Sequence, residues 1–215
     1  MDRFERTGTR ERTYVPPSTV ALTFDDGPDP VWTPQVLAEL ERGGAATTFF
    51  VDAQRADANR SLIAAIEAGG HEVGLHCFEH VRHSELDEAA IAADTVAGLG
   101  LLEEIGVSPS AWRAPWGDVT AATRRVAAEQ RLKLWDWNVD SHDWRGDSCE
   151  EMLLALEAEG GLCSGAVVLM HDGIGPGALR SGCAQTVRLT AALLELAAAG
   201  GLRTVAISDM PRETA

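Results

Sequence analysis

The stretch VALTFDDGP, from Val20 to Pro28, joins an apolar β-run to two adjacent carboxylates and a turn. Consecutive strand residues point to opposite faces, so Asp25 and Asp26 can address one centre only where the strand ends and bends. Gly27-Pro28 supplies that bend. One carboxylate can then hold a metal ion while the other accepts a proton. An isolated motif of this kind is more often an ordinary acidic strand end, so the rest of the chain decides.

Strand and helix patterns alternate along the chain beyond this stretch. Apolar or β-branched runs predict strands near 20–25, 46–51, 71–75, 111–113, 133–139, 166–170 and 203–207. Helical spacing of apolar residues predicts helices near 33–43, 59–68, 86–105, 119–130, 148–159 and 187–196. Such alternation favours parallel strands joined by right-handed crossovers. Seven repeats are many for an open sheet, so we expect an α/β fold with a distorted or incomplete (β/α) barrel of about seven parallel strands. A doubly wound open sheet is the alternative.

Local signals set several boundaries. Thr33 before Pro34 predicts a helix N-cap with proline at the first helical position. Ser148 with Glu151 three residues later predicts a capping box. Residues 1–18 show little periodicity, so we expect a flexible N-terminal lead-in and one domain over 19–215. A chain of 215 residues with 45% hydrophobic side chains supports one sizeable core.

The composition argues against several classes of partner. The formal net charge is -15, which disfavours nucleic acid and anionic membranes because both require clustered Lys and Arg. Residues 1–13 lack the apolar segment of a signal peptide, and no run reaches membrane-spanning length, so we expect a cytoplasmic protein. The cysteines show no CxxC pairing, and we expect no disulfides. They are Cys77, Cys149, Cys163 and Cys183.

Titratable side chains follow the carboxyl ends of five predicted strands, where parallel α/β folds place their active sites. A random scatter of six histidines would seldom produce this arrangement, so we expect these side chains to converge on one site. They are Asp25 and Asp26, His76 and His80, Arg113, Asp140 and Asp143, and His171.

The motif HCFEH over residues 76–80 sets two imidazoles four residues apart, which on a helical turn places both on one face. Two imidazoles and the Asp26 carboxylate would leave a coordination position open for water, the pattern of a catalytic zinc-type site. A lone HxxxH is more often a solvated helix face, but the adjacent carboxylates favour a metal. Three nearby residues are assigned to packing or surface roles instead: His71, Cys77 and His83.

Five motifs occur in order: TFDDGP at 23–28, HxxxH at 76–80, RAPWG at 113–117, DSHDW at 140–144 and LMH at 169–171. Together they resemble the motifs of the polysaccharide deacetylases of carbohydrate esterase family 4, which include chitin and peptidoglycan N-acetylglucosamine deacetylases. The resemblance spans about residues 20–207 and also implies a distorted barrel, with the 19–215 domain as the catalytic domain.

The resemblance implies a role for each matched residue. The metal ligands would be Asp26, His76 and His80. Asp25 would be the general base, oriented by Arg113, and the backbone N–H of Trp116 would hold the oxyanion. His171 would be the general acid for the leaving amine, with Asp143 stabilising its protonated form. The substrate contacts would be Trp137, Trp144 and Leu169 around the acetyl methyl, with Pro115 and Asp140 beside them.

The implied cofactor is a divalent metal ion. Zinc is the first choice, and cobalt, nickel and iron are alternatives because the ligand set suits several ions. The chain departs from the common family pattern at four positions, which bear on the substrate more than on the reaction. These are Leu75, Cys77, Val81 and Trp116.

The expected activity is metal-dependent removal of the N-acetyl group from an N-acetylated sugar or glycosylated metabolite, which releases acetate and a free amine. Two alternatives are an amidohydrolase for a non-sugar amide or ureide, and a carbohydrate-binding relative without catalysis. The complete set of ligands and proton-transfer groups disfavours both. Because no export signal is visible, we expect a small soluble substrate, with Trp116 and the Gly-rich loop 173–182 shaping its pocket.

Overall fold

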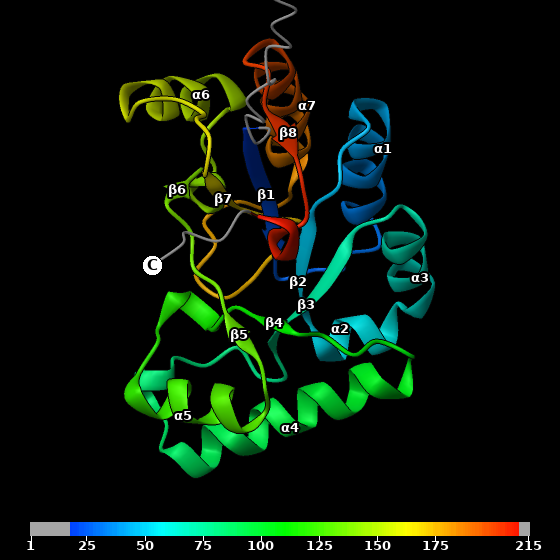
Figure 1. Cartoon of the computed structure of the whole chain (residues 1–215), viewed down its shortest axis with the longest axis vertical. Helices are drawn as coiled ribbons and strands as arrows, with labels where there is room; N and C mark the ends of the chain where they lie inside the picture. Colours follow the sequence, from blue (N-terminus) through cyan, green and yellow to red (C-terminus); the bar gives the residue numbers. More distant parts are fainter. Residues whose placement is uncertain (1–17, 211–215) are drawn as a thin grey trace, which may run out of the picture.

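A single curved sheet organises the computed structural model, which describes residues 18–210. Its paired strands are all parallel within those residues. The strand order is β5-β4-β3-β2-β1-β7-β6, and β8 pairs with the start of β1. The strands are β1 (Thr19–Asp25), β2 (Thr48–Asp52), β3 (Glu72–Cys77), β4 (Ala111–Trp112), β5 (Lys133–Leu134), β6 (Val139–Asp140), β7 (Val167–His171) and β8 (Arg203–Thr204). The sheet curls into an incomplete barrel, which confirms the expected fold class (Figure 1).

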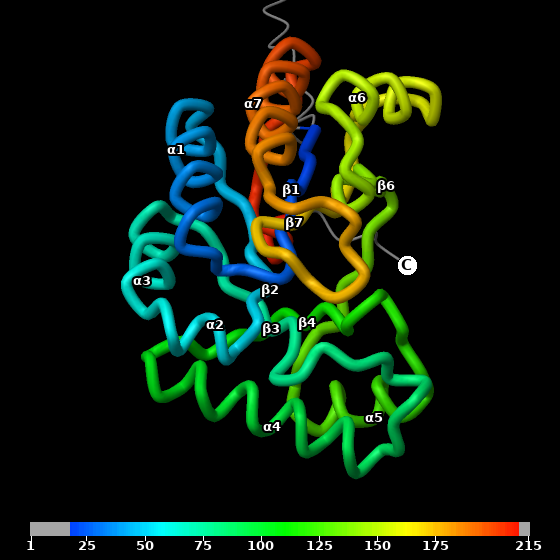
Figure 2. The backbone as a smooth tube through the Cα atoms, turned by 180° about the vertical axis from the view of Figure 1, so that it is seen from behind, coloured from blue at the N-terminus to red at the C-terminus, as the bar shows by residue number. Residues whose placement is uncertain are grey.

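Helices cover the outside of this sheet (Figures 1 and 2). They pack on one another in the order α6, α7, α1, α3, α2, α4, α5. The α-helices are α1 (Thr33–Gly43), α2 (Ala53–Ala58), α3 (Arg60–Ala68), α4 (Glu88–Glu104), α5 (Ala121–Glu129), α6 (Cys149–Ala158) and α7 (Ala184–Ala199). Short 3-10 helices are η1 (His83–Glu85), η2 (Pro115–Gly117), η3 (Asp143–Arg145) and η4 (Ile207–Asp209).

Strand β1 is buried on both faces, and its four central apolar residues, Val20, Ala21, Leu22 and Phe24, suit that burial. Val20, Leu22 and Phe24 belong to the large core between the sheet and the helices. Ala21 belongs to a second, smaller cluster inside the barrel. Because side chains alternate along a strand, Thr23 and Asp25 share the inner face with Ala21. Polar groups therefore line the inner face of β1 toward its carboxyl end.

The predicted strand over 133–139 is wrong as a single element. It is two strands at opposite ends of the sheet order: β5 pairs with β4, and β6 pairs with β7. The residues between them cross from one sheet edge to the other along the side between α5 and α6 (Figures 1 and 2). Asn138 anchors this crossing, since its Oδ1 accepts the Val167 N–H at 2.7 Å. The segment thus spans the open side of the barrel.

Other local predictions have mixed outcomes. The capping box of α6 is confirmed, because Ser148 and Glu151 exchange side-chain-to-backbone hydrogen bonds. The N-cap of α1 is Trp32 rather than Thr33, whose hydroxyl bonds the Asp172 carboxylate instead. The short helix α2 was missed, because six residues are too few to show helical periodicity.

Two expectations concern parts of the chain beyond this description. The predicted lead-in over 1–18 lies outside the described residues except for Ser18. The last part of the predicted domain, residues 211–215, also lies outside them. Among residues 18–210, no helix is both long enough and apolar enough to cross a bilayer.

Candidate active site

A cavity of about 300 Å³ opens at the carboxyl ends of the strands. Most of the predicted site residues line it: Asp25, Asp26, His76, His80, Trp116, Trp137, Asp140, Trp144, Leu169 and His171. Arg113 and Asp143 are buried and contact the lining residues Asp25 and His171 from outside the cavity. Pro115 is also buried and does not line the cavity. The side chains predicted from separate strand ends therefore do meet.

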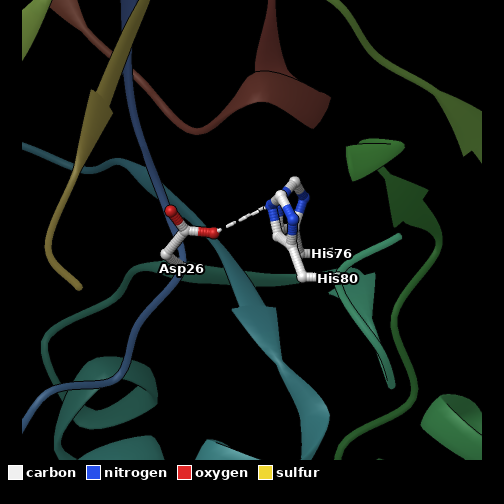
Figure 3. Close-up of side chains that lie close together, drawn as sticks. All are labelled: Asp26, His76 and His80. Carbon is white, nitrogen blue, oxygen red and sulfur yellow. Dashed lines mark ion pairs between the residues drawn. The ribbon is translucent and has the colours of Figure 1, made fainter. Parts of the chain in front are cut away.

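Asp26, His76 and His80 form a compact donor cluster (Figure 3). Asp26 Oδ1 lies 3.5 Å from His76 Nε2 and 3.3 Å from His80 Nε2, and all three ligand atoms lie within 4.8 Å of one another. Ligands on a tetrahedral ion, at metal distances of about 2.0–2.1 Å, are about 3.3 Å apart. The cluster thus fits a divalent metal ion.

The orientation of His76 also suits a ligand. Its Nδ1 lies 2.8 Å from the Arg113 carbonyl oxygen. A carbonyl only accepts, so Nδ1 carries a proton, and Nε2, which faces Asp26, is the nitrogen left to bind a metal ion. Burial alone would raise the pKa of Asp26, but hydrogen bonds from the two imidazoles hold it well below its usual value. The carboxylate is therefore ionised, as a metal ligand must be.

The two histidines are not on a helical turn, so that part of the sequence argument is wrong. His76 is in β3, and His80 follows a bend at 78–79. The Asp94 carboxylate, from α4, accepts the backbone N–H groups of Phe78 at 3.1 Å and Glu79 at 2.7 Å. This bend brings the two imidazole centroids to 5.1 Å.

Asp25 points to the barrel interior, where Arg113 holds it. Arg113 Nη1 donates to Asp25 Oδ1 at 2.9 Å and to Thr23 Oγ1 at 2.7 Å, and Nη2 donates to the Asp136 carbonyl at 3.2 Å. The guanidinium also stacks over the Phe50 ring at 4.3 Å. Both charged side chains are almost fully buried. The carboxylate is therefore fixed in place and charge-compensated.

On the neighbouring strand, the partly exposed His171 pairs with the buried Asp143. Asp143 Oδ1 accepts from His171 Nδ1 at 2.7 Å. Burial alone would lower the pKa of His171, but the Asp143 charge and hydrogen bond, with smaller contributions from Asp26 and Asp25, raise it to about 9. The imidazole is therefore protonated near neutral pH and can give up a proton from Nε2.

The indole of Trp116 forms part of the cavity wall. Trp116 has left-handed backbone with φ 63°, which is uncommon for a bulky residue. Its ring lies 5.3 Å from the His80 ring, and the Arg82 guanidinium stacks over it at 4.1 Å. A Cβ atom built on Gly177 would lie 2.6 Å from the indole, so the Gly-rich loop touches the ring.

Sequence reasoning missed Arg180, which supports the His171–Asp143 pair. Its Nη1 donates to Asp143 Oδ2 at 2.9 Å, and its Nη2 donates to the carbonyls of His171 and Gly173 at 3.0 Å. Arg180 lies in a Gly-rich loop without a recognisable motif. Its positive charge was therefore the only feature of the sequence that could have indicated a role. Sequence reasoning also gave no role to Arg82, which lines the cavity.

His71 and His83 are both buried and lie outside the donor cluster. His83 Nδ1 is 3.0 Å from Thr123 Oγ1, and burial lowers the pKa of His83 to about 4. Cys77 is buried as well and is not part of the cluster. His71, Cys77 and His83 are therefore packing residues.

The fold and the site define an incomplete α/β barrel with a candidate hydrolytic centre at its carboxyl edge. The family model "Polysaccharide deacetylase" matches residues 12–135, more than half of the chain. The chain therefore belongs to the polysaccharide deacetylase family, as the five motifs predicted. The matched range contains the donor cluster, Asp25, Arg113 and Trp116, but ends before Asp143 and His171.

Curated relatives match over most of the chain. It is 34% identical over 195 residues to a peptidoglycan-N-acetylglucosamine deacetylase of Bacillus cereus, covering 90% of this chain and 88% of the relative. It is 33% identical over 165 residues to a chitooligosaccharide deacetylase of Bradyrhizobium, covering 76% and 74%. A family 4 carbohydrate esterase from Streptomyces lividans, solved with acetate, superposes with a TM-score of 0.76 at 30% identity, covering 87% and 91%.

Proposed function

We propose that this protein is a metal-dependent N-deacetylase that hydrolyses the acetamide of an N-acetylated sugar to acetate and a free amine. The observation that carries the proposal is the meeting, in one cavity, of the Asp26–His76–His80 cluster with the Asp25 carboxylate and the His171 imidazole. The similarity to a peptidoglycan-N-acetylglucosamine deacetylase and a chitooligosaccharide deacetylase supports this substrate class.

We assign each residue of the site a separate role in the reaction. A divalent metal held by Asp26, His76 and His80 would supply Lewis-acid polarisation of the acetamide carbonyl. We assign Asp25 as the base that takes a proton from the attacking water, because Arg113 pairs with its carboxylate and orients it. We assign the Trp116 N–H to the oxyanion that forms on the carbonyl oxygen.

His171 completes the reaction as general acid. An amide anion is a very poor leaving group, so the nitrogen must be protonated as the C–N bond breaks. Asp143 holds Nδ1 of His171, and the imidazole lines the cavity where the leaving nitrogen would lie. Charge from Asp143 keeps the proton on the imidazole until the leaving nitrogen takes it.

Three apolar side chains that line the cavity suit the acetyl methyl group. Trp137, Trp144 and Leu169 line it, and we assign them to this contact. We assign Asp140, which also lines the cavity, to the sugar hydroxyls. Pro115 is buried and does not line the cavity, and we assign it to shaping the loop rather than to direct contact.

We further propose a small soluble substrate and zinc as the metal. The cavity volume of about 300 Å³ is at the lower end of the range for small-molecule pockets, which suits one sugar better than several. Cobalt, nickel and iron remain candidates, because two imidazoles and one carboxylate suit all of these ions.

The test combines metal analysis of the purified protein with acetate release from N-acetylglucosamine, its oligomers and chitin. We expect bound zinc, acetate release, and loss of activity on chelation that added metal restores. Full activity in rigorously metal-free protein would contradict metal dependence. Sugar binding without acetate release from any substrate would instead indicate an inactive carbohydrate-binding relative.

A further inference from the structure

Arg55, on α2, lies outside the motifs of the site but bonds two of its backbone carbonyls. Arg55 Nη1 donates to the Asp26 carbonyl at 2.7 Å, and Nη2 donates to the Ile174 carbonyl at 2.8 Å. Its Nε lies 3.6 Å from Asp52 Oδ2. One guanidinium therefore joins the turn after β1 to the Gly-rich loop after β7.

The Asp26 backbone is in a conformation that needs support. Its φ of 69° lies in the left-handed region, which non-glycine residues seldom adopt. The next carbonyl, of Gly27, accepts the Asp52 N–H at 2.9 Å. Asp52 also begins α2 by accepting the N–H groups of Gln54 and Arg55. The end of β2 and the start of α2 thus hold both carbonyls of the turn that aims Asp26.

The Gly-rich loop restrains Asp26 from the other side. A Cβ atom on Gly175 would lie 2.0 Å from Asp26 Oδ2, and one on Gly173 would lie 2.2 Å from the Asp26 carbonyl oxygen. Only glycine allows this approach. Oδ2 therefore rests against the loop, while Oδ1 faces the two imidazoles. Arg55 bonds Ile174, between these two glycines, and so fixes the loop against the carboxylate.

We propose that Arg55 is a positioning residue that sets the metal affinity of the site by fixing both the Asp26 backbone and the loop behind its carboxylate. The inference rests on the proposed function only in taking Asp26, His76 and His80 as ligands. Groups behind metal ligands typically change metal affinity by about 10–100-fold when removed. Arg55 acts here through backbone carbonyls rather than through the carboxylate itself.

The test compares Arg55→Met with Arg60→Met in the full chain. Arg60 is a matched control because it is also a helical arginine paired three residues back, with Asp57, at an exposed position. Metal-free proteins are titrated with Zn²⁺ against a chromogenic chelator. We expect the zinc Kd of Arg55→Met to rise by about 10–100-fold and that of Arg60→Met to stay at the wild-type value.

Thermal melts of the metal-free proteins separate positioning from general stability. A lower Tm for Arg55→Met with an unchanged zinc Kd would overturn the proposal. Arg55→Lys keeps the charge but offers a point donor in place of the fork, so we expect an intermediate Kd, which also provides the test if Arg55→Met does not fold. Wild-type protein that binds no zinc would contradict the proposed function, whereas zinc binding equal in wild type and both Arg55 variants contradicts only this inference.

Discussion

Asp25 and Asp26 are adjacent in the chain but have different surroundings. Asp25 still belongs to β1 and pairs with Arg113 inside the barrel. Asp26 turns into left-handed backbone and faces two imidazoles. The sequence allowed this separation to be predicted, because two consecutive carboxylates can share a centre only where a strand ends. It did not show that Asp26 would need left-handed backbone, which depends on contacts from β2, α2 and the loop after β7.

The proton-transfer assignment predicts the effect of Asp25→Asn and His171→Ala. Each should lower kcat at least about a hundredfold, the usual size of an acid or base contribution, while zinc affinity stays nearly unchanged. Asn is chosen at position 25 because its amide oxygen can still accept from Arg113. Removing one partner of a buried ion pair altogether costs about 3–5 kcal/mol.

Steady-state kinetics with parallel zinc titration checks this prediction. Asp118→Asn is the control, since the Asp118 carboxylate accepts its hydrogen bonds from Ser84 and does not line the cavity. Loss of zinc binding in Asp25→Asn would show that the roles of the two aspartates are exchanged. Near-normal turnover in His171→Ala would show that His171 is not the general acid.

The His171–Asp143 pair predicts a shift in the pH profile. The acid form of His171 is lost as pH rises through its pKa, which Asp143 helps to raise to about 9. In Asp143→Asn the imidazolium loses its carboxylate partner, so its pKa falls. The alkaline limb of the kcat profile should therefore move to lower pH, while the acidic limb moves less. An unchanged alkaline limb would mean that another group controls it.

At the scale of elements, regular segments were predictable and irregular ones were not. The α6 capping box and the apolar strand β7 follow from local sequence, because their signals lie within a few residues. The segment 133–140 misled the prediction because its tryptophans favour β-structure, although only its two ends pair, with β4 and β7. Nothing local distinguishes a strand from a chain that crosses between two sheet edges.

The same limit explains the residues that were missed around the site. The bend between His76 and His80 depends on Asp94, which is distant in sequence. Arg55 and Arg180 act through carbonyls and carboxylates on other elements. Such contacts become visible only when the barrel brings the loops together. The donor set was predictable because parallel strands place their carboxyl ends at one edge.

At the scale of the whole molecule, loops from distant strands meet over the site. Trp116 follows β4 and Gly177 follows β7, and three strands lie between these two in the sheet order. The close approach of Gly177 to the indole therefore joins opposite sides of the barrel mouth. Arg82 stacks on the indole and supports it there. This contact closes one side of the cavity that contains the donor cluster.

A cavity closed on one side predicts that sugar units beyond the first one or two do not raise kcat/KM. A long sugar chain needs an open groove on both sides of the reacting unit, whereas a mono- or disaccharide does not. We expect kcat/KM to be about equal for N-acetylglucosamine-type substrates of one or two units and of five or more, measured as acetate release per chain end.

Trp116→Ala should raise the ratio of kcat/KM for long chains to kcat/KM for short chains, because it removes the indole but keeps the backbone N–H. Arg42→Ala, a change on an exposed residue of α1, should leave that ratio unchanged. A steep rise of kcat/KM with chain length in the wild type would instead demonstrate an extended groove, and would place the natural substrate among polymers.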